Sequence, residues 1–425
     1  MTIANKIQKT MDEAIIVATK EMPVKCRSNR KWVKIIYNIF DGVDDFRQKL
    51  KITYELNDVL CMCLLIAMRG KFTSFSYASK YMQIRVDYFS RLGLVKNKRV
   101  PSHDTLRRIF MNIEPNDLRD TLLNRIKIMV EKIANHTTDN GKTRGIRLLS
   151  GDGKTFRGSG RKGNYPKRNV NVFNMFDVSA DICLDSIPLD DKESEIPTMQ
   201  RVLQKYNLQN SIVTADALHC QTKTVDVITK RGGLYCIAIK DNQSQYRENV
   251  MHIIKNKKGD YSEYIYNDCV YQISFINYET TDIDFPHAKA YVSMTSHKRK
   301  DQQNYNPEPM YFVTSADNPD LIMQAIDSRW SVEQMHWYKD VYLHEDSCTT
   351  TDKTAIKAIA VMNNIVYSIY RLTAALFYEK DMAKTRIIFE DCPETVFKKL
   401  MPLMEKQNLT NLLKANLKGR KKNED

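Results

Sequence analysis

Three acidic residues have the type and the placement that metal-assisted phosphate chemistry needs. Asp152 and Asp216 each come directly after a predicted strand, and Glu333 lies on a long predicted helix. Because the two strands are expected to be neighbours in one sheet, their carboxylates should meet at one edge. Carboxylate oxygens suit Mg²⁺ or Mn²⁺, and two such ions roughly 3.5 to 4 Å apart can activate a water or 3′-hydroxyl and stabilise the leaving oxygen. The spacing predicts a two-metal centre acting on nucleic-acid phosphodiesters.

A basic segment follows the first of these acids. Residues 153–169 (GKTFRGSGRKGNYPKRN) contain cations and glycines but no acid. Glycines let the backbone approach a phosphate closely, and the cations neutralise it. A small anionic substrate would not require so extended a segment. We therefore predict DNA contacts by Lys154, Arg157, Arg161, Lys162, Lys167 and Arg168.

The acidic residues also have ordinary structural interpretations, which leave the carboxylate hypothesis open at this point. An Asp before a Gly, as at position 152, is usually a turn residue. A helical Glu with an Arg four residues earlier, as in Glu333 with Arg329, is usually a solvated ion pair of small energetic consequence. His336 and Asp340 share the helix face of Glu333, which gives this helix a coherent polar side.

Two aromatic residues beside Glu333 are predicted to be structural. Trp330 and Trp337, with Ile326 and Val341, have the spacing of a core stripe, which we favour over a surface on which bases stack. The run at 344–346 (His-Glu-Asp) could suggest a metal cluster, but adjacent residues point in different directions. We expect surface or supporting roles for that run.

Composition places limits on the class of protein. The chain has 425 residues and a mass of 49.5 kDa, enough for two or three domains. Its 65 Lys and Arg against 51 Asp and Glu give a formal charge of +14 and favour a polyanionic partner. Charges interrupt residues 1–20, so no signal peptide is predicted, and the apolar run 59–68 is too short to span a membrane. We expect a soluble cytoplasmic protein associated with the nucleoid.

The nine cysteines predict neither a disulfide framework nor a zinc site. Their number is odd, and none of them form a CxxC pair. Cys61 and Cys63 lie within the apolar run and are expected to be small core residues.

The first third of the chain has a helical pattern, over residues 53–130. A helix is expected to stop at Arg69-Gly70, another to cover residues 72–82, and a third to start with Ser102 as its N-cap and an apolar stripe at 106, 109 and 110. These helices could form a DNA-reading helix-turn-helix or an ordinary bundle, and the pattern slightly favours the bundle. The polar segment 137–145 predicts a domain boundary.

The period then changes to that of an α/β domain. Strands are expected at 146–151, 172–178, 183–189, 211–215 and 234–239, with helices at 196–206 and 221–231. This order predicts a ribonuclease-H-like α/β core. Further β segments are expected between 261 and 315, separated by a loop at 297–309, before helices at 319–343 and 355–376. The last residues, KGRKKNED, predict a basic disordered tail.

These elements suggest four regions along the chain. A helical extension would cover residues 1–43, and an all-helical, potentially DNA-binding domain would cover 44–136. The catalytic domain would span 146–378, with the β insertion at about 255–315. A helical segment and the basic tail would fill 379–425.

An ordered series of motifs resembles a known family. The strings are LLSGDGKTFRGS (148–159), DDKESEI (190–196), IVTADALHCQ (212–221), YCIAIKDNQ (235–243) and SRWSVEQMHWYKDVYLHEDSC (328–348), preceded by PSHDTLRRIF (101–110). They are similar to bacterial insertion-sequence transposases of the H-repeat-associated type, which belong to the DDE superfamily and have a ribonuclease-H-like core. The resemblance covers most of the chain in order, which makes it more specific than any single motif.

The resemblance implies roles for particular residues. It makes Asp152, Asp216 and Glu333 the catalytic metal ligands, with Mg²⁺ or Mn²⁺ as the cofactor and two ions expected. Lys240 and Arg329 would contact DNA, and supporting positions would be Lys192, Glu195, Gln243, His336 and Asp340.

The chain also departs from the family pattern. Gln334 stands where the family commonly has Asn after the catalytic Glu, and Arg329 stands where a His precedes the Trp. The segment KESE at 192–195 replaces a frequent KSNE. None of these changes removes an expected metal ligand, so they bear on substrate detail more than on the chemistry.

The resulting hypothesis is a DNA transposase that binds the terminal inverted repeats of its element, cuts the ends and joins them to target DNA. Bringing two ends together needs at least two active sites, so a homodimer is expected. One alternative is a non-catalytic, DNA-binding derivative of a transposase. Another is a metal-dependent DNA nuclease, which would share the active site but would not join strands.

Overall fold

The computed structural model describes residues 28–123, 146–160, 169–189, 195–256, 260–266, 269–277, 279, 283–298, 308–377 and 381–404. Several predictions lie outside these residues. They concern most of the extension at 1–43, the boundary at 137–145, most of the loop at 297–309, the basic tail, and the side chains of Arg161, Lys162, Lys167, Arg168 and Lys192.

A helical region precedes the sheet. Its helices are α2 (Lys31–Ile39), α3 (Leu56–Met68), α4 (Phe75–Ile84), α5 (Val86–Arg91) and α6 (His103–Asn112). The apolar helix α3 is buried along almost its whole length, including Cys61 and Cys63, as the sequence predicted. Its predicted end is confirmed, because Gly70 adopts φ +64°, a left-handed conformation that suits a residue without a Cβ.

The predicted N-cap of α6 is also confirmed. The Ser102 hydroxyl accepts a hydrogen bond from the Thr105 backbone N–H at 3.2 Å. Leu106, Ile109 and Phe110 are buried, and the Phe110 ring lies 5.4 Å from the ring of Phe72. The apolar stripe of α6 therefore packs into the core of the helical region.

One nine-stranded sheet follows, in the order β3-β2-β1-β4-β5-β9-β8-β7-β6. The pairs β1–β4 and β4–β5 are parallel, and all other neighbours are antiparallel. The predicted β insertion extends the same sheet, because β9 pairs with β5. The strands are β1 (Arg147–Phe156), β2 (Val170–Asp177), β3 (Ile182–Pro188), β4 (Ser211–Ala215), β5 (Leu234–Ile239), β6 (Asp260–Tyr266), β7 (Cys269–Asn277), β8 (Ala290–Lys298) and β9 (Met310–Thr314).

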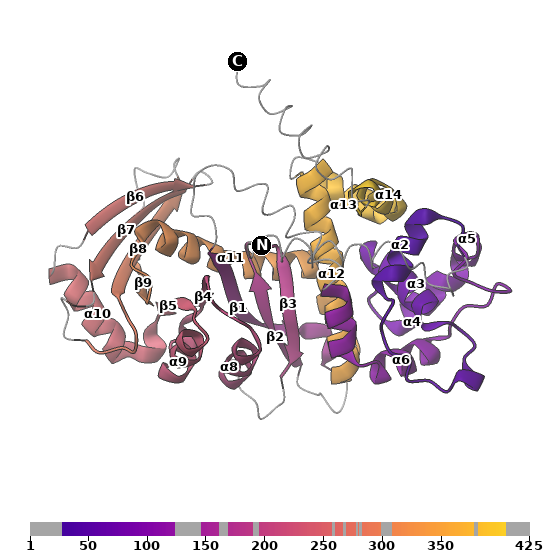
Figure 1. Ribbon diagram of the computed structural model, residues 1–425, viewed down its shortest axis with the longest axis horizontal. Helices are drawn as coiled ribbons and strands as arrows, with labels where there is room; N and C mark the ends of the chain where they lie inside the picture. The colour runs from indigo at the N-terminus through magenta and orange to yellow at the C-terminus, as the bar shows by residue number, and fades with distance from the viewer. Residues whose placement is uncertain are drawn as a thin grey trace, which may run out of the picture.

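Helices cover both faces of the sheet (Figure 1). On one face, α8 (Glu195–Lys205) and α9 (Thr222–Lys230) bury residues such as Val213 and Ile237 of the central strands. On the other face, the first turns of α11 (Pro319–Val341) pack on Ile212 and Phe312. The side chains of the central strands alternate between these two cores, which is the period-two pattern that identified the strands.

The helix α12 (Lys353–Phe377) connects the sheet with the helical region. It packs along β3 and against α3 and α6, and in Figure 1 it stands between the two parts. The C-terminal helices α13 (Met382–Asp391) and α14 (Pro393–Met404) return to the helical region, where Trp32 stacks on Phe397 with ring centroids 6.4 Å apart. A further helix, α10 (Ser244–Asn256), packs on β8 and β9 and was not predicted.

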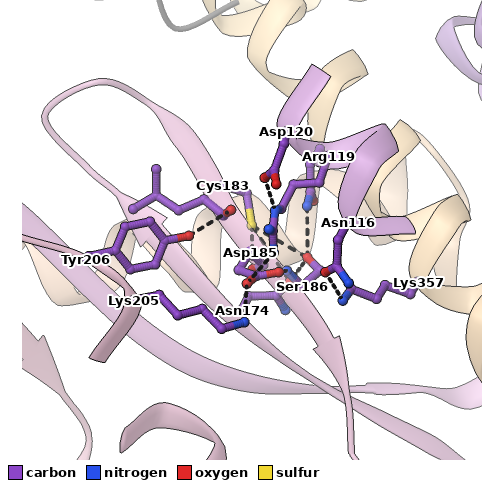
Figure 2. Close-up of polar contacts among 12 residues, drawn as sticks. Asn116, Arg119, Asp120, Asn174, Cys183, Asp185, Ser186, Lys205, Tyr206 and Lys357 are labelled. Atoms are coloured by element: carbon purple, nitrogen blue, oxygen red, sulfur yellow. Dashed lines mark hydrogen bonds and ion pairs between the residues drawn. The ribbon is translucent and has the colours of Figure 1, made fainter. Parts of the chain in front are cut away.

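A buried ion pair also holds the two parts together, as Figure 2 shows. Arg119, in the helical segment 115–123, donates to the Asp185 carboxylate of β3 at 2.7 Å. The Asp185 side chain is fully buried. Nearby, Lys357 of α12 donates to the Asn116 side chain at 2.6 Å. These contacts fix the helical segment against the edge strand of the sheet.

Among the described helices, none combines the length and the apolar character needed to cross a membrane.

Candidate active site

The parallel pairing of β1 and β4 brings the two aspartates together. The last paired residues of these strands are Gly151 and Ala215, and Asp152 and Asp216 are the next residue of each. The sequence predicted that Asp152 follows its strand, and this detail is wrong. The strand β1 continues to Phe156 because β2 keeps pairing with it after β4 has ended. Asp216 caps a short turn and accepts from the Leu218 backbone N–H at 2.9 Å.

The third predicted acid stands over this edge on α11. Glu333 is half exposed, and its carboxylate lies 3.7 Å from the Arg329 guanidinium. Arg329 is itself only 7% exposed, and its guanidinium lies 4.3 Å from the centroid of the Trp330 ring. Arg329 is thus paired within the site beside Glu333, and its contact with DNA stays a prediction.

A fourth acid lies at the same place. Glu195 is the first residue of α8, and its carboxylate lies so close to Gly153 that a Cβ there would be 2.1 Å from Oε2. Its other oxygen, Oε1, is 2.8 Å from Nε2 of the fully buried His219. Glu195 was predicted only as a supporting residue, and the structure puts its carboxylate next to the backbone that carries Asp152.

The clustering of acids has a clear electrostatic signature. Burial raises the pKa of Asp152 to about 7, and the negative charges of Glu195, Asp216 and Glu333 add to this shift. A hydrogen bond from the Gly153 backbone N–H acts in the opposite direction without cancelling the effect. Asp152 thus lies in a field of negative charge that a cation would relieve.

The fit of this cluster to a divalent metal rests on its chemistry. Hard carboxylate oxygens are the ligands that Mg²⁺ and Mn²⁺ prefer, and the repulsion at Asp152 is what a bound cation would remove. In the described part of the chain, no group of three or more His, Cys, Asp or Glu side chains is arranged to hold a metal ion. The donor types fit a metal, and the side chains would have to converge to hold it.

A neutral histidine supports Asp152. Nδ1 of His336 lies 3.6 Å from the Asp152 carboxylate, and its Nε2 lies 2.9 Å from the Asn174 side-chain nitrogen. Burial, with Lys339 and Lys154 nearby, lowers the pKa of His336 well below its usual value. Since Asn174 uses its oxygen to accept from Ser186, its NH₂ group donates to Nε2. The proton of the neutral ring is then on Nδ1, facing Asp152.

A buried ion cluster fixes α11 against β1. Lys154 donates to Asp340 of α11 and, at 2.6 Å, to Glu345. Lys339 lies 3.4 Å from the same Glu345 carboxylate, and Asn363 of α12 donates to it at 3.1 Å. Burial alone would raise the pKa of Glu345, but the two lysines lower it to about 2.

The same cluster includes a residue that was predicted to contact DNA. Lys154 is 8% exposed, and its ammonium group is paired with two carboxylates. It is therefore a structural cation that positions α11. Glu345, within the run at 344–346, and Asp340 both pair with Lys154, and their supporting roles in the site stay predictions.

The predicted core stripe on α11 is wrong. Trp330 and Trp337 are 38% and 57% exposed, and Val341 is also exposed, whereas Ile326 is buried. The buried face of α11 instead includes polar residues such as His336. Apolar residues such as Val332 and Met335 share this buried face, so the spacing of the two tryptophans indicated the wrong stripe.

Other predicted residues surround the site. Lys240 follows β5 and is exposed, and Arg157 is exposed with its guanidinium 3.5 Å from Asp346. Gln243 donates to the Cys220 carbonyl, and Asn242 donates to the Ala217 carbonyl at 3.1 Å. These two amides hold the segment after Asp216, which fits the supporting role predicted for Gln243.

Sequence reasoning did not single out His219 or Asn174. His219 lies within the motif at 212–221, but there it has only the pattern of an ordinary buried residue in a short turn. Asn174 lies within a strand whose residues from Val172 to Asp177 are all buried, so the sequence carries no sign of its contact with His336. Only the packing of α11 and α8 against β1 and β2 shows these roles.

Comparison with known proteins identifies the family of the chain. Residues 143–369 match the family model of the Transposase DDE domain, and residues 37–125 match the model called DDE_Tnp_1-associated. The chain belongs to the DDE transposase family. The resemblance to the H-repeat-associated type is confirmed by its relatives.

Two of these relatives come from Escherichia coli (strain K12). The chain is 23% identical to "H repeat-associated putative transposase YhhI" over 77% of this chain and 88% of that protein. It is 25% identical to "H repeat-associated putative transposase YbfD" over 48% of this chain and 75% of that protein. A solved piggyBac transposase synaptic complex with hairpin DNA gives a TM-score of 0.40 at 13% identity, covering 96% of this chain and 84% of that chain.

Proposed function

We propose that this transposase cuts the DNA ends of its own element and joins them to target DNA, with Asp152, Asp216 and Glu333 as its catalytic metal ligands. The observation that carries the proposal is the equivalent position of the two aspartates on neighbouring parallel strands, with Glu333 on the helix that crosses them. DDE transposase domains generally use divalent metal ions. When bound, Mg²⁺ or Mn²⁺, two ions in our proposal, would activate the attacking oxygen and stabilise the leaving one.

We further propose that residues 146–378 form a ribonuclease-H-like catalytic domain. The strand order β3-β2-β1-β4-β5, in which β1, β4 and β5 are parallel and β2 is antiparallel to both β1 and β3, supports this proposal. The β insertion at about 255–315 extends the sheet beyond β5. The helical domain at 44–136, the extension before it and the segment from 379 onward complete the proposed division.

The surrounding residues position the three ligands in this proposal. His336 directs its Nδ1–H toward Asp152, which holds that carboxylate near the face of α11. Lys154 joins β1 to α11 through Asp340, and this link keeps Glu333 above the strand edge. Such buried, paired groups fix a catalytic geometry better than exposed side chains can.

The proposed partner is double-stranded DNA, namely the terminal inverted repeats of the element and its target. The formal charge of +14 supports a polyanionic partner. Arg157 and Lys240 are exposed near the site and could contact phosphates, and the exposed α11 face offers Trp330 and Trp337 as further surface. The contacts assigned to the basic segment after Gly160, the homodimer and the association with the nucleoid remain predictions.

The test is cleavage and joining of labelled DNA that carries the sequences flanking the gene, in Mg²⁺ or Mn²⁺. Wild type should cut and join, whereas Asp152→Ala and Glu333→Ala should bind the DNA without cutting it. Asp226→Asn is a matched control, because Asp226 is also paired with a histidine, His287, at 3.3 Å, but lies outside the acidic cluster. Normal cutting by Asp152→Ala would refute the proposal.

The same assay separates the two alternatives. Cutting by wild type without joining and without preference for the end sequence would favour a metal-dependent nuclease. Binding without cutting by wild type would favour a non-catalytic derivative. All three candidate ligands are present in the sequence, which speaks against a decayed enzyme.

A further inference from the structure

Glu195 reaches the catalytic centre from the face of the sheet opposite to Glu333. It starts α8, which packs on the core that includes Val213, whereas Glu333 lies on α11. The route is open because residue 153 is a glycine, and any side chain there would collide with the Glu195 carboxylate. Two helices on opposite faces thus bring one carboxylate each to the backbone around Asp152.

His219 holds Glu195 in this position. The ring is fully buried, its Nε2 lies 2.8 Å from Oε1 of Glu195, and its Nδ1 has no hydrogen-bond partner. Since a buried N–H without a partner costs more than a bare ring nitrogen, Nε2 carries the N–H that donates to Glu195. The ring also packs edge-on against Phe173, with centroids 6.0 Å apart. His219 belongs to the turn that directly follows Asp216.

An ordinary role for Glu195 explains less of this arrangement. An acid in the first turn of a helix interacts favourably with the helix dipole, and it does so equally well when it faces solvent. Glu195 instead points at Gly153, so its carboxylate lies against the backbone of the residue that follows Asp152. Holding like charges together in this way costs free energy unless a cation is shared between them.

We propose that Glu195 is a fourth carboxylate ligand of the metal centre and that His219 is the residue that positions it. This inference rests on the proposed function. In it, Glu195 contributes an oxygen from the α8 face, and Asp152 contributes from the strand between the two helices. The carboxylate is therefore directly involved in metal binding, and His219 acts only through it.

The experiment measures Mn²⁺ binding to the full-length protein by titration calorimetry, without DNA. Glu195→Gln keeps the shape and a hydrogen-bond acceptor for His219 but loses the charge. It should weaken Mn²⁺ binding at least about tenfold while leaving the thermal unfolding temperature in EDTA unchanged or higher. His219→Gln should weaken binding by about tenfold, as is typical when a group that orients a ligand is lost. Asp226→Asn should bind as wild type.

Two further variants keep the outcomes distinct. Glu195→Asp retains the charge but shortens the side chain by one methylene, so this variant should also bind Mn²⁺ more weakly. It replaces Glu195→Gln in the experiment if that variant fails to fold. Asp152→Asn is the reference for loss of a central ligand. If Asp152→Asn loses binding while both Glu195 variants bind as wild type, Glu195 is not a ligand and the proposed function stands. If wild type binds no Mn²⁺, both this inference and the metal-dependent function fail.

Discussion

The repulsion around Asp152 predicts that Asp152→Asn makes the metal-free protein more stable at alkaline pH. The pKa of Asp152 in the folded protein is about 7, against 3.8 for the unperturbed group. The folded chain therefore keeps a proton that the unfolded chain releases. The retained proton stabilises the folded state. This stabilisation is fully present below the pKa of Asp152 in the unfolded chain and is lost as the pH rises through 7. Asn cannot ionise, so the variant does not suffer this loss.

The size of the effect follows from the shift. About three pKa units correspond to at most about 4 kcal/mol in the free energy of unfolding. The Asp152 side chain is 31% exposed, so solvent screening reduces this to roughly 1–2 kcal/mol at pH 8. At roughly 2–4 °C per kcal/mol for a domain of this kind, the midpoint of thermal unfolding should rise by several degrees. At pH 5 the gain should be clearly smaller, because the folded wild type is then largely protonated.

The assay is thermal unfolding of wild type and Asp152→Asn in EDTA at pH 5 and pH 8, with Asp226→Asn as the control. Adding Mn²⁺ at pH 8 should reverse the order, because the ion stabilises only the protein that binds it. A variant that is less stable than wild type at pH 8, or a difference that does not change with pH, would refute the electrostatic reasoning.

Three other substitutions test how the site is held. Glu345→Gln should cost roughly 3–5 kcal/mol in urea unfolding at neutral pH, because it leaves two buried lysines without their shared carboxylate. Since the pKa of the Glu345 carboxyl is lowered to about 2, its contribution to stability is present above pH 4.5 and is lost toward pH 2. Gly153→Ala should leave the fold intact but displace Glu195 and weaken DNA cleavage at least about tenfold in a standard kinetic assay. Arg119→Ala should cost roughly 3–5 kcal/mol in urea unfolding, because the buried Asp185 carboxylate loses its partner at 2.7 Å and keeps the longer ion pair with the half-exposed Lys205 at 3.8 Å.

The stability predictions have a matched control on the surface. Arg386 and Glu390 form an exposed pair of the same chemistry at 2.7 Å on α13. Arg386→Ala should cost at most about 1 kcal/mol, because exposed pairs contribute little. Equal losses for Arg119→Ala and Arg386→Ala would contradict the claim that burial gives the Arg119–Asp185 pair its strength. For Gly153→Ala, unchanged cleavage would show that Glu195 can move away without consequence.

Much of the fold could be predicted because local patterns and tertiary structure agree. The strands β4 and β5 have the predicted bounds, since both are short apolar runs buried on both faces. The cap at Ser102 and the stop at Gly70 follow from local backbone chemistry. The helix α10 was missed because it follows a polar stretch and has one fully buried residue, Val250, so its apolar periodicity is weak.

The site was predicted in outline but not in its connections. The positions of Asp152 and Asp216 followed from strand order, which is a property of sequence pattern. The burial of Lys154 could not be predicted, because it depends on Asp340 and Glu345, which are distant in sequence. The stripe on α11 was misplaced because the buried face of this helix mixes apolar residues such as Val332 and Met335 with polar ones such as His336, so hydrophobicity alone does not identify it. The sequence pattern therefore predicted the positions of Asp152 and Asp216, whereas the burial of Lys154 near them depends on tertiary packing.

The most direct test of the metal-dependent account replaces a non-bridging oxygen of the scissile phosphate by sulfur in an element-end substrate. Sulfur binds Mg²⁺ poorly and Mn²⁺ better, because Mn²⁺ is the softer ion. The account predicts that wild type cuts the sulfur-containing DNA slowly in Mg²⁺ and regains much of its rate in Mn²⁺, while Asp152→Ala is inactive in both. Equal rates on both substrates in Mg²⁺, or cleavage by Asp152→Ala, would contradict a metal ion held at this phosphate by the acidic cluster.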